Sequence, residues 1–205
     1  NRYQHQHKEG WVFFQTRYRE TDLWIRARCA LEEEALGAVL DCRHQLEAYI
    51  SRFPDFMQSL SPLPDDPFAP PLVRRMLHAA QKAGVGPMAS VAGAIAQSVG
   101  LDLKHLSPSI IIENGGDCYL DLQEETSVGI FAGPHSPFTG KIALRFMADR
   151  FPLGICTSSG TVGHSLSFGK ADAVTVVSRD AALADAAATA LGNLVRKPQD
   201  IGKAL

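Results

Sequence analysis

Two short segments near the N-terminus alternate apolar or aromatic residues with polar ones. Residues 11–16 and 22–28 are rich in aromatic and β-branched side chains, and a polar cluster at residues 19–22 lies between them. Alternation with a period of two is typical of half-buried strands, so the pattern predicts a β-hairpin. Aromatic side chains on an exposed face of that hairpin would favour a homodimer, and those concerned are Trp11, Phe13 and Trp24.

The next part of the chain has helical spacing. Apolar residues recur every three to four positions over residues 31–53, three glutamates begin this segment, and Pro54 follows it. Acidic residues suit the positive end of a helix dipole and proline ends a helix, so the pattern predicts one long helix. Two further helices are predicted over residues 72–83 and 88–99, closed by Gly84 and Gly100.

Beyond residue 105 the pattern returns to short apolar runs separated by glycine and proline. An alanine-rich segment at residues 181–194 predicts a last helix with Asp180 as its N-cap. This order of elements predicts an α+β fold, with a largely antiparallel sheet and helices packed on one face. The strand-like runs are residues 110–113, 118–122, 127–131, 142–146, 154–157 and 173–177.

Composition and charge narrow the class of protein. The chain has 205 residues, of which 45% are hydrophobic and 20% charged, and its formal net charge is −2. We expect residues 1–205 to form one domain, with native sequence continuing past Leu205. The near-zero charge provides no basic surface for nucleic acid, and no apolar run approaches the roughly 20 residues of a membrane-spanning helix. We therefore expect a cytoplasmic protein that binds neither nucleic acid nor membrane, with its four cysteines as free thiols.

A polar turn joins two of the predicted strands. It consists of Asn114, Gly115, Gly116 and Asp117. Asn-Gly and Gly-Gly are strong signals of a tight hairpin turn, which is the simplest interpretation. Alternatively, a backbone without side chains lets a ligand approach, while Asn114 or Asp117 supplies a polar contact. Both interpretations stay open.

The last predicted helix carries an acid and a hydroxyl on one face. Asp185 and Thr189 are four residues apart, and alanine or leucine surrounds them. An acid on a buried face needs a partner, because burying an unpaired carboxylate is very costly. That partner is either a backbone amide or a cation such as Mg²⁺, which prefers carboxylate and hydroxyl oxygens.

A hydroxyl-rich segment ends the predicted strand at residues 154–157. Its hydroxyls and flexible backbone suit the binding of an anion. Among the histidines, His164 is the most interesting because glycine and serine flank it. A Cys156 nucleophile with His164 as its base is a weaker alternative, since no sequence feature specifies the pair. The residues of the segment are Thr157, Ser158, Ser159 and Gly160.

Taken together and in this order, the motifs resemble the signature blocks of the ApbE-like proteins. These are FAD:protein FMN transferases, once called thiamine biosynthesis lipoproteins, and the chain is most similar to an uncharacterised short branch of that superfamily. The resemblance covers roughly residues 85–195, and its last block is the most specific. The blocks are Gly93-Ala94-Ile95-Ala96-Gln97, Asn114-Gly115-Gly116-Asp117, Thr157-Ser158-Ser159-Gly160 and Ala184-Asp185-Ala186-Ala187-Ala188-Thr189.

The resemblance implies a role for each block. In the transferases, the acid and threonine of the last block bind Mg²⁺ together with a backbone carbonyl of the first block. Carried over, the metal ligands are Asp185, Thr189 and Ala96. The Asn-Gly-Gly-Asp block would lie beside a flavin, and the hydroxyl-rich block near its diphosphate. The implied reaction is metal-assisted phosphoryl transfer, in which FMN passes from FAD to a threonine of an acceptor protein and AMP leaves.

Two departures from the family pattern keep other hypotheses open. The transferases have a lysine at the position of Gln97, and beyond their histidine they carry an Asp-Pro and a Thr-Gly segment that is missing after His164. The metal half of the site is therefore kept in sequence and the catalytic half is altered. One hypothesis is an Mg²⁺-dependent FMN transferase or FAD pyrophosphatase assisted by His164. The others are a non-catalytic protein that binds a flavin or another nucleotide, and a scaffold or assembly protein that retains the fold.

Overall fold

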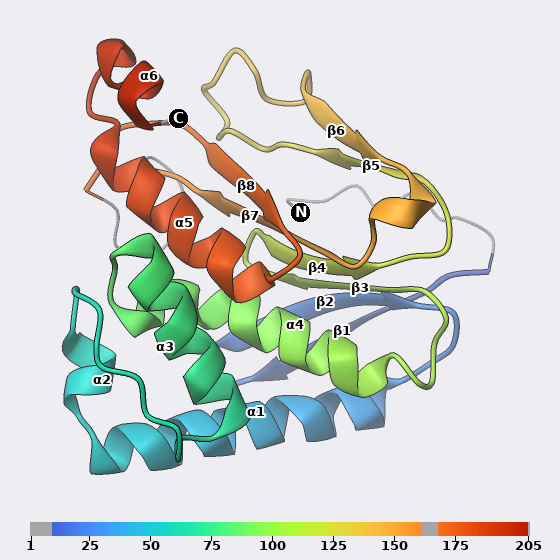
Figure 1. The fold of residues 1–205 in the computed structure, drawn as a ribbon. Helices are drawn as coiled ribbons and strands as arrows, with labels where there is room; N and C mark the ends of the chain where they lie inside the picture. The colour runs from blue at the N-terminus through green and yellow to red at the C-terminus, as the bar shows by residue number, and fades with distance from the viewer. Residues whose placement is uncertain (1–9, 161–167, 205) are drawn as a thin grey trace.

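The computed structural model describes residues 10–160 and 168–204. Its centre is a six-stranded sheet in which every neighbouring pair of strands is antiparallel. Figure 1 shows the longer helices covering one face of this sheet, which confirms the predicted α+β class. In spatial order the strands are β1 (Val12–Tyr18), β2 (Thr21–Ala27), β3 (Ile110–Asn114), β4 (Asp117–Asp121), β7 (Leu153–Ser158) and β8 (Val174–Ser178).

A second, two-stranded sheet pairs β5 (Thr126–Gly129) with β6 (Ala143–Phe146). It lies on the side of the main sheet opposite the helices (Figure 1). The longer helices are α1 (Glu32–Arg52), α3 (Pro71–Ala83), α4 (Val91–Leu103) and α5 (Ala181–Leu194). The short ones are α2 (Asp55–Gln58), η1 (Pro87–Ser90), η2 (Ala148–Arg150), η3 (Pro198–Asp200) and α6 (Ile201–Ala204).

Local signals placed most of these elements correctly. The N-terminal hairpin is confirmed, and α1 ends at Arg52, just before Pro54. Gly84 closes α3 in the left-handed conformation, with φ of 73°. The helix α5 has the predicted bounds, and the Asp180 carboxylate accepts hydrogen bonds from the amides of Ala182 and Leu183, at 3.0 and 3.3 Å.

The predicted end of the third helix is wrong. We expected Gly100 to follow the helix, but it lies inside α4, which continues to Leu103. The reason is a contact from a distant part of the chain, because a side chain at Gly100 would overlap the ring of Tyr119 on β4. Glycine is therefore needed here for close packing and not for a helix cap.

The two faces of the main sheet bury different clusters. Because side chains alternate along a strand, Tyr119 points toward the helices and Leu120 toward β5 and β6. The helix side holds the large core, which includes Leu23, Ile25, Ile110 and Ile112. The opposite face holds a small cluster formed by Leu120, Leu122, Phe151, Leu153 and Ile155.

The helices α4 and α5 lie so close together that no side chain fits between their backbones at Gly93. A side chain at Gly93 of α4 would overlap the carbonyl oxygen of Ala181 on α5 and come within 2.9 Å of Asp185 Cβ. Gly154 on β7 is equally close to Ala181. The small residues in α4 therefore let another backbone come close, and that backbone carries Asp185.

Within the described residues, no single helix is both long and apolar enough to cross a membrane. Two helical segments meet that test only as a pair, Pro71–Ala83 with Pro87–Leu103, and a bend of 103° separates them.

Candidate functional site

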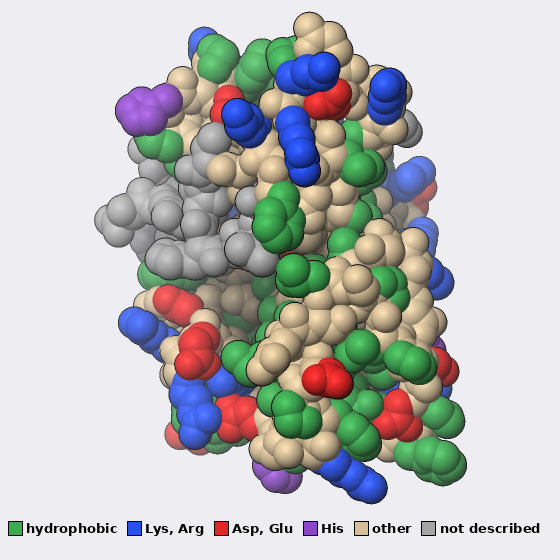
Figure 2. All heavy atoms as spheres, turned by 90° about the vertical axis from the view of Figure 1, so that its left-hand side faces the viewer, with side chains coloured by type: hydrophobic (Ala, Val, Ile, Leu, Met, Phe, Trp, Pro, Cys, Tyr) green, Lys and Arg blue, Asp and Glu red, His purple; other side chains and the backbone are tan. Residues whose placement is uncertain are grey.

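A cavity of about 310 Å³ lies among α4, α5, β4 and the segment that follows α2. Three of the residues singled out from the sequence line it, namely Asp117, Asp185 and Thr189. Asp117 and Asp185 are far apart in the chain, and the packing of α5 against β4 and β7 brings them together. Figure 2 shows the side of the molecule where α2, α3 and α5 lie. Charged side chains gather mostly toward the two ends of that face.

One face of α5 supplies most of the polar groups in this cavity. Asp185, Thr189 and Asn193 follow one another at intervals of four residues and all line it. Residues at this spacing share a helix face, so Asn193 could have been found by extending the pattern by one turn. Its side-chain oxygen accepts a hydrogen bond from the amide of Phe168 at 2.8 Å, which connects α5 to the segment before β8.

The carboxylate of Asp185 lies at the first turn of α4. Its Oδ2 accepts a hydrogen bond from the amide of Gly93 at 2.9 Å, and the amide of Ala92 also bonds to the carboxylate. The side chain is only 9% exposed, and burial raises its pKa well above the ordinary value, with Asp117 adding repulsion. The structural role expected for a buried acid is therefore present, since Asp185 bonds free amides at a helix start.

Asp117 is the second acid in the cavity. Its Oδ1 accepts a hydrogen bond from the amide of Thr157 at 3.2 Å. The pKa of Asp117 is raised from 3.8 to about 7, mainly because water is removed from around the carboxyl and to a lesser extent by the charge of Glu113. The Cys156 thiol and the Thr157 amide act in the opposite direction. Near neutral pH, Asp117 can therefore both give and accept a proton.

The cavity has an unbalanced charge. Among the described residues that line it there are two carboxyl groups and no lysine, arginine or histidine. Two acids in a poorly solvated space repel each other unless a proton or a cation lies between them. No group of three or more His, Cys, Asp or Glu side chains in the described part of the chain is arranged to hold a metal. A cation here would thus have to share the acids with a hydroxyl, a carbonyl or a ligand.

Cys156 does not have the environment of a nucleophile. Its side chain is completely buried, and its Sγ donates a hydrogen bond to the carbonyl of Ala181 at 3.4 Å. Burial raises the pKa of this thiol well above its ordinary value, and the carboxyl of Asp117 raises it further. The reactive thiolate is disfavoured, which argues against the Cys156–His164 pair. His164 itself lies outside the described residues.

The polar turn between β3 and β4 is a tight hairpin. Gly115 and Gly116 are its two central residues, with φ of 67° and 123°. Positive φ at both positions is the geometry that a two-residue hairpin prefers, so the turn interpretation is confirmed. Asn114 donates a hydrogen bond from Nδ2 to the carbonyl of Ala92 at 3.2 Å, which fastens the end of β3 to the start of α4. A side chain at Gly115 would meet no atom within 4 Å, so the outer side of the turn is open.

The hydroxyl-rich segment has several of its groups already in use. The amide of Gly160 donates to the carbonyl of Ala171 at 2.9 Å, and the hydroxyl of Thr157 shares a hydrogen bond of 2.9 Å with Thr175. The amide of Thr157 is bonded to Asp117, as described above. Ser158 faces Gly192 of α5 and Ser159 lines a second cavity. Hydrogen bonds to neighbouring segments therefore hold this strand end in place. Its contact with a phosphate stays a prediction.

Residues 93–97, the first of the four motifs that resemble the ApbE-like blocks, are buried in the interior. The side-chain oxygen of Gln97 accepts a hydrogen bond from the amide of Ala181 at 2.7 Å, and this bond fastens α4 to the first residue of α5. Ala96 is completely buried and is not among the residues that line the cavity, whereas Ala92, one turn earlier, is. A metal contact from the Ala96 carbonyl stays a prediction, and the Ala92 carbonyl already accepts the hydrogen bond from Asn114.

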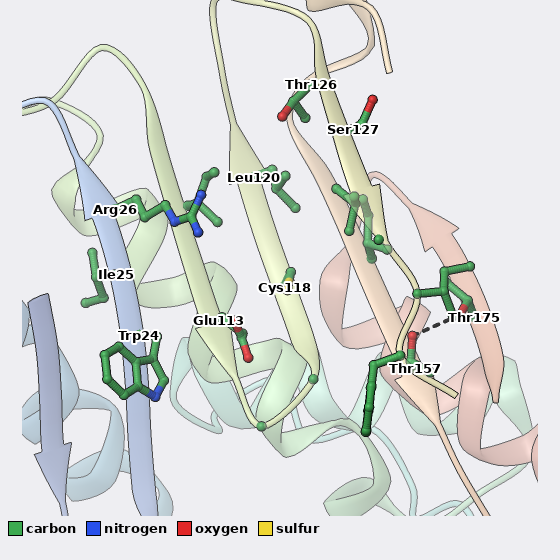
Figure 3. Close-up of a pocket in the computed structure, with 18 of the residues that line it drawn as sticks. Trp24, Ile25, Arg26, Glu113, Cys118, Leu120, Thr126, Ser127, Thr157 and Thr175 are labelled. Carbon is green, nitrogen blue, oxygen red and sulfur yellow. Dashed lines mark hydrogen bonds between the residues drawn. The ribbon is translucent and has the colours of Figure 1, made fainter. Parts of the chain in front are cut away.

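The predicted nucleotide-binding residues lie on both sides of the sheet. Gly115, Gly116, Thr157 and Ser159 line a second cavity, of about 270 Å³, between the main sheet and the segment at residues 126–131. Figure 3 shows side chains that enter it from β2, β3, β4, β7 and β8. Asp117, Asp185 and Thr189 belong to the first cavity. The β3–β4 turn and the end of β7 form the wall between the two.

Comparison with known proteins shows the family. A sequence profile described as AbpE bacteria matches residues 3–204. The UPF0280 protein MJ1526 of Methanocaldococcus jannaschii is 47% identical over 191 residues, which is 85% of this chain and 77% of the relative. The UPF0280 protein of Methanothermobacter thermautotrophicus is 43% identical over 198 residues, 94% of this chain and 75% of the relative. The UPF0280 protein MmarC5_0355 of Methanococcus maripaludis is 46% identical over 162 residues, which is 78% of this chain and 65% of the relative.

Proposed function

We propose that this chain, which belongs to the AbpE bacteria family and to the UPF0280 proteins, processes a flavin nucleotide with the help of Mg²⁺. The reaction would be that of an FAD:protein FMN transferase or of an FAD pyrophosphatase. The four motifs that resemble the ApbE-like blocks support this class. The cavity between α4, α5 and β4 would be the place of reaction.

One observation carries the proposal: a buried acid, Asp185, and a half-buried acid, Asp117, line a cavity whose described lining holds no basic side chain. Burial raises the pKa values of both acids, and repulsion from Asp117 raises that of Asp185 further. A divalent cation would relieve this repulsion, and Mg²⁺ typically uses one or two protein carboxylates together with water and substrate phosphates. The residues present fit such an ion better than a structural zinc, which would need four protein ligands.

The residues that would hold Mg²⁺ are Asp185 and Thr189, with a backbone carbonyl of α4 as a further oxygen. When bound, the ion would supply positive charge to the diphosphate and lower the barrier to breaking it. The cavity of about 310 Å³ is too small for a whole dinucleotide, so it would take only the diphosphate end. The residues that line the cavity would hold the diphosphate end in place and exclude water from it.

In this proposal, Asp117 would accept the proton that the reaction releases. Its pKa of about 7 is close to the value at which a general base works best at neutral pH. The acceptor hydroxyl, or water, would form a new bond from its oxygen to the FMN phosphorus while the P–O–P bridge breaks. AMP would leave with the bridging oxygen, and the hydroxyl proton would pass to Asp117. Water as the acceptor gives FMN and AMP, and a threonine gives a flavinylated protein.

The test is chromatography of FAD incubated with the protein and Mg²⁺, beside an EDTA control. We expect metal-dependent release of AMP, lost in Asp185→Asn and retained in Asp149→Asn, which removes an exposed acid on η2. Intact FAD in every sample would contradict the enzymatic part of the proposal. AMP release that Asp185→Asn leaves unchanged would contradict the assignment of the site.

A non-catalytic nucleotide-binding protein is the second candidate. What favours it is the inert character of Cys156 and the absence of histidine, lysine and arginine from the described lining of the cavity. Equilibrium dialysis of FAD with Mg²⁺ separates the two candidates. Metal-dependent binding without any release of AMP would establish the second and exclude the first.

A further inference from the structure

We propose that a third cavity, at the end of the sheet where β8 begins, binds a small molecule that carries an oxyanion on an apolar body. The oxyanion would be a carboxylate or a phosphate. The side chains that would bind it are those of Lys170, Arg196 and Lys197. This inference goes beyond the proposed function, because neither Asp117 nor Asp185 lines this cavity.

Three segments that are far apart in the sequence form the third cavity. They are the connection between β5 and β6, the segment before β8, and the segment that follows α5. Figure 1 shows the connection between β5 and β6, the start of β8 and α6 at the same end of the molecule. The volume is about 540 Å³, within the roughly 300–1,000 Å³ of pockets that enclose a ligand. The cavity can therefore hold a whole small molecule.

Positive charge is concentrated in this cavity, although the chain as a whole has a net charge of −2. The described residues that line it include Lys170, Arg196 and Lys197 against a single acid, Asp172. Figure 2 shows Lys and Arg side chains gathered at the end of the molecule where α6 lies. None of the three cationic side chains forms a salt bridge with a described residue. The excess of positive charge would attract an anion into the cavity.

The backbone holds the cationic residues close together. The amide of Lys170 donates a hydrogen bond at 2.8 Å to the carbonyl of Val195, the residue before Arg196. The carboxylate of Asp200 accepts hydrogen bonds from the amides of Arg196 and Lys197, at 3.1 and 3.0 Å. Like charges at neighbouring positions repel each other, and an anion between them relieves the repulsion. Arginine and lysine bind carboxylates and phosphates through charge-assisted hydrogen bonds, which makes either group a suitable partner.

The rest of the wall is largely apolar. Ile130, Phe138 and Ile142 contribute from the connection between β5 and β6, and Val195 and Ile201 from the segment after α5. Phe138, Ile142 and Ile201 are 57%, 41% and 48% exposed. The body of a ligand that covers these side chains would stabilise the complex through the hydrophobic effect. An inorganic anion would leave them open to water, so the site fits an anion that carries an apolar chain or ring.

The experiment is calorimetric titration of the full chain with octanoate and, separately, with octyl phosphate, in EDTA so that no metal contributes. We expect at least one of these anions to bind, and the tighter of the two identifies the preferred oxyanion. Octanol has the same apolar chain without the charge. It should bind at least roughly 10-fold more weakly, because it cannot form the charge-assisted hydrogen bonds.

The double variant Lys170→Gln, Arg196→Gln tests the cationic side chains. It should weaken binding of the anion by roughly 5- to 25-fold, the combined effect of losing two partly exposed charge pairs. Arg150→Gln with Arg179→Gln is the matched control, because it removes two positive charges from exposed residues that do not line the cavity. This control should bind the anion like the unmodified protein.

Phe138→Ser tests the apolar wall at an exposed position, and it should also weaken binding. The proposal is overturned if neither anion binds, if octanol binds as tightly as the anions, or if the double variant binds like its control. Asp185→Asn should bind the anion like the unmodified protein, because Asp185 lines a different cavity. Failure of the proposed FAD reaction would therefore leave this result unchanged.

Discussion

The two cavities are built from different materials although they share a wall. On the helix side, the acids lie between small residues of α4 and α5, and hydrogen bonds to backbone amides hold them. On the opposite side, long and aromatic side chains line a space covered by the segment at residues 126–131. The first cavity depends on where two helix backbones lie, and the second on which side chains project from the strands. We therefore expect the first cavity to respond most to substitutions that shift a helix backbone, and the second to substitutions of single side chains.

The largest effect on stability is expected on the helix side of the sheet, where the backbones of α4 and α5 lie closest together. Gly93→Ala would push a methyl group into the backbone of α5, next to Asp185. We expect a loss of about 1–3 kcal/mol or more in the free energy of unfolding, measured by chemical denaturation. Gly129→Ala on β5 is the matched variant for the other side, because its new methyl group would meet no atom within 4 Å. Equal stability of the two variants would contradict the conclusion that close backbone packing limits substitutions only on the helix side.

The next effect concerns the bond between α4 and α5. Gln97→Leu removes the acceptor for the amide of Ala181 and leaves that amide buried without a partner. We expect a cost of about 1–3 kcal/mol in the free energy of unfolding. Gln123→Leu, at an exposed position, should change it little. If the two variants unfold at the same denaturant concentration, Gln97 does not fix the position of α5.

A third effect is expected in the pH dependence of the stability of the metal-free protein. The folded pKa of Asp117 is about 7 against 3.8 in the unfolded chain, so the folded state retains a proton that the unfolded state releases. Stability from this group is therefore complete below pH 4 and is lost as the pH rises toward 7. Asp117→Asn should flatten this decline in denaturation experiments across that range. Asp149→Asn should leave the decline unchanged, and the same slope in both variants would contradict the assigned environment.

The smallest effect is on thiol reactivity. All four cysteines are free, and Cys29 is exposed, whereas Cys156 is completely buried with a raised pKa. A thiol reagent applied to the folded protein should modify Cys29 quickly and Cys156 only on unfolding, as followed by mass spectrometry of peptides. Modification of Cys156 before unfolding would reopen its role as a nucleophile.

Local signals in the sequence predicted much of the fold but not the division into two cavities. The N-cap at Asp180 and the turn at Gly115 and Gly116 are decided by neighbouring residues, so the pattern gave them correctly. Gly100 was misjudged because its reason, the ring of Tyr119, comes from a distant strand.

The same limit applies to the sites. Asp185 and Thr189 could be found because a helix face is readable from spacing, and Asn193 follows from the same rule. Trp24, Arg26 and Glu113 are single residues on strands, and alternation alone does not tell a covered face from an open one. Only the placement of residues 126–131 over that face turns it into the wall of a cavity.

The most direct test of the central claim is the binding of a divalent cation to the acids between α4 and α5. Mn²⁺ can stand in for Mg²⁺, and electron paramagnetic resonance measures how much of it stays free during a titration. We predict saturable binding that is lost in Asp185→Asn, weakened in Thr189→Val and unchanged in Asp149→Asn. Equal Mn²⁺ binding by the unmodified protein and Asp185→Asn would contradict the account, and Asp185 would then be a structural acid at the start of α4.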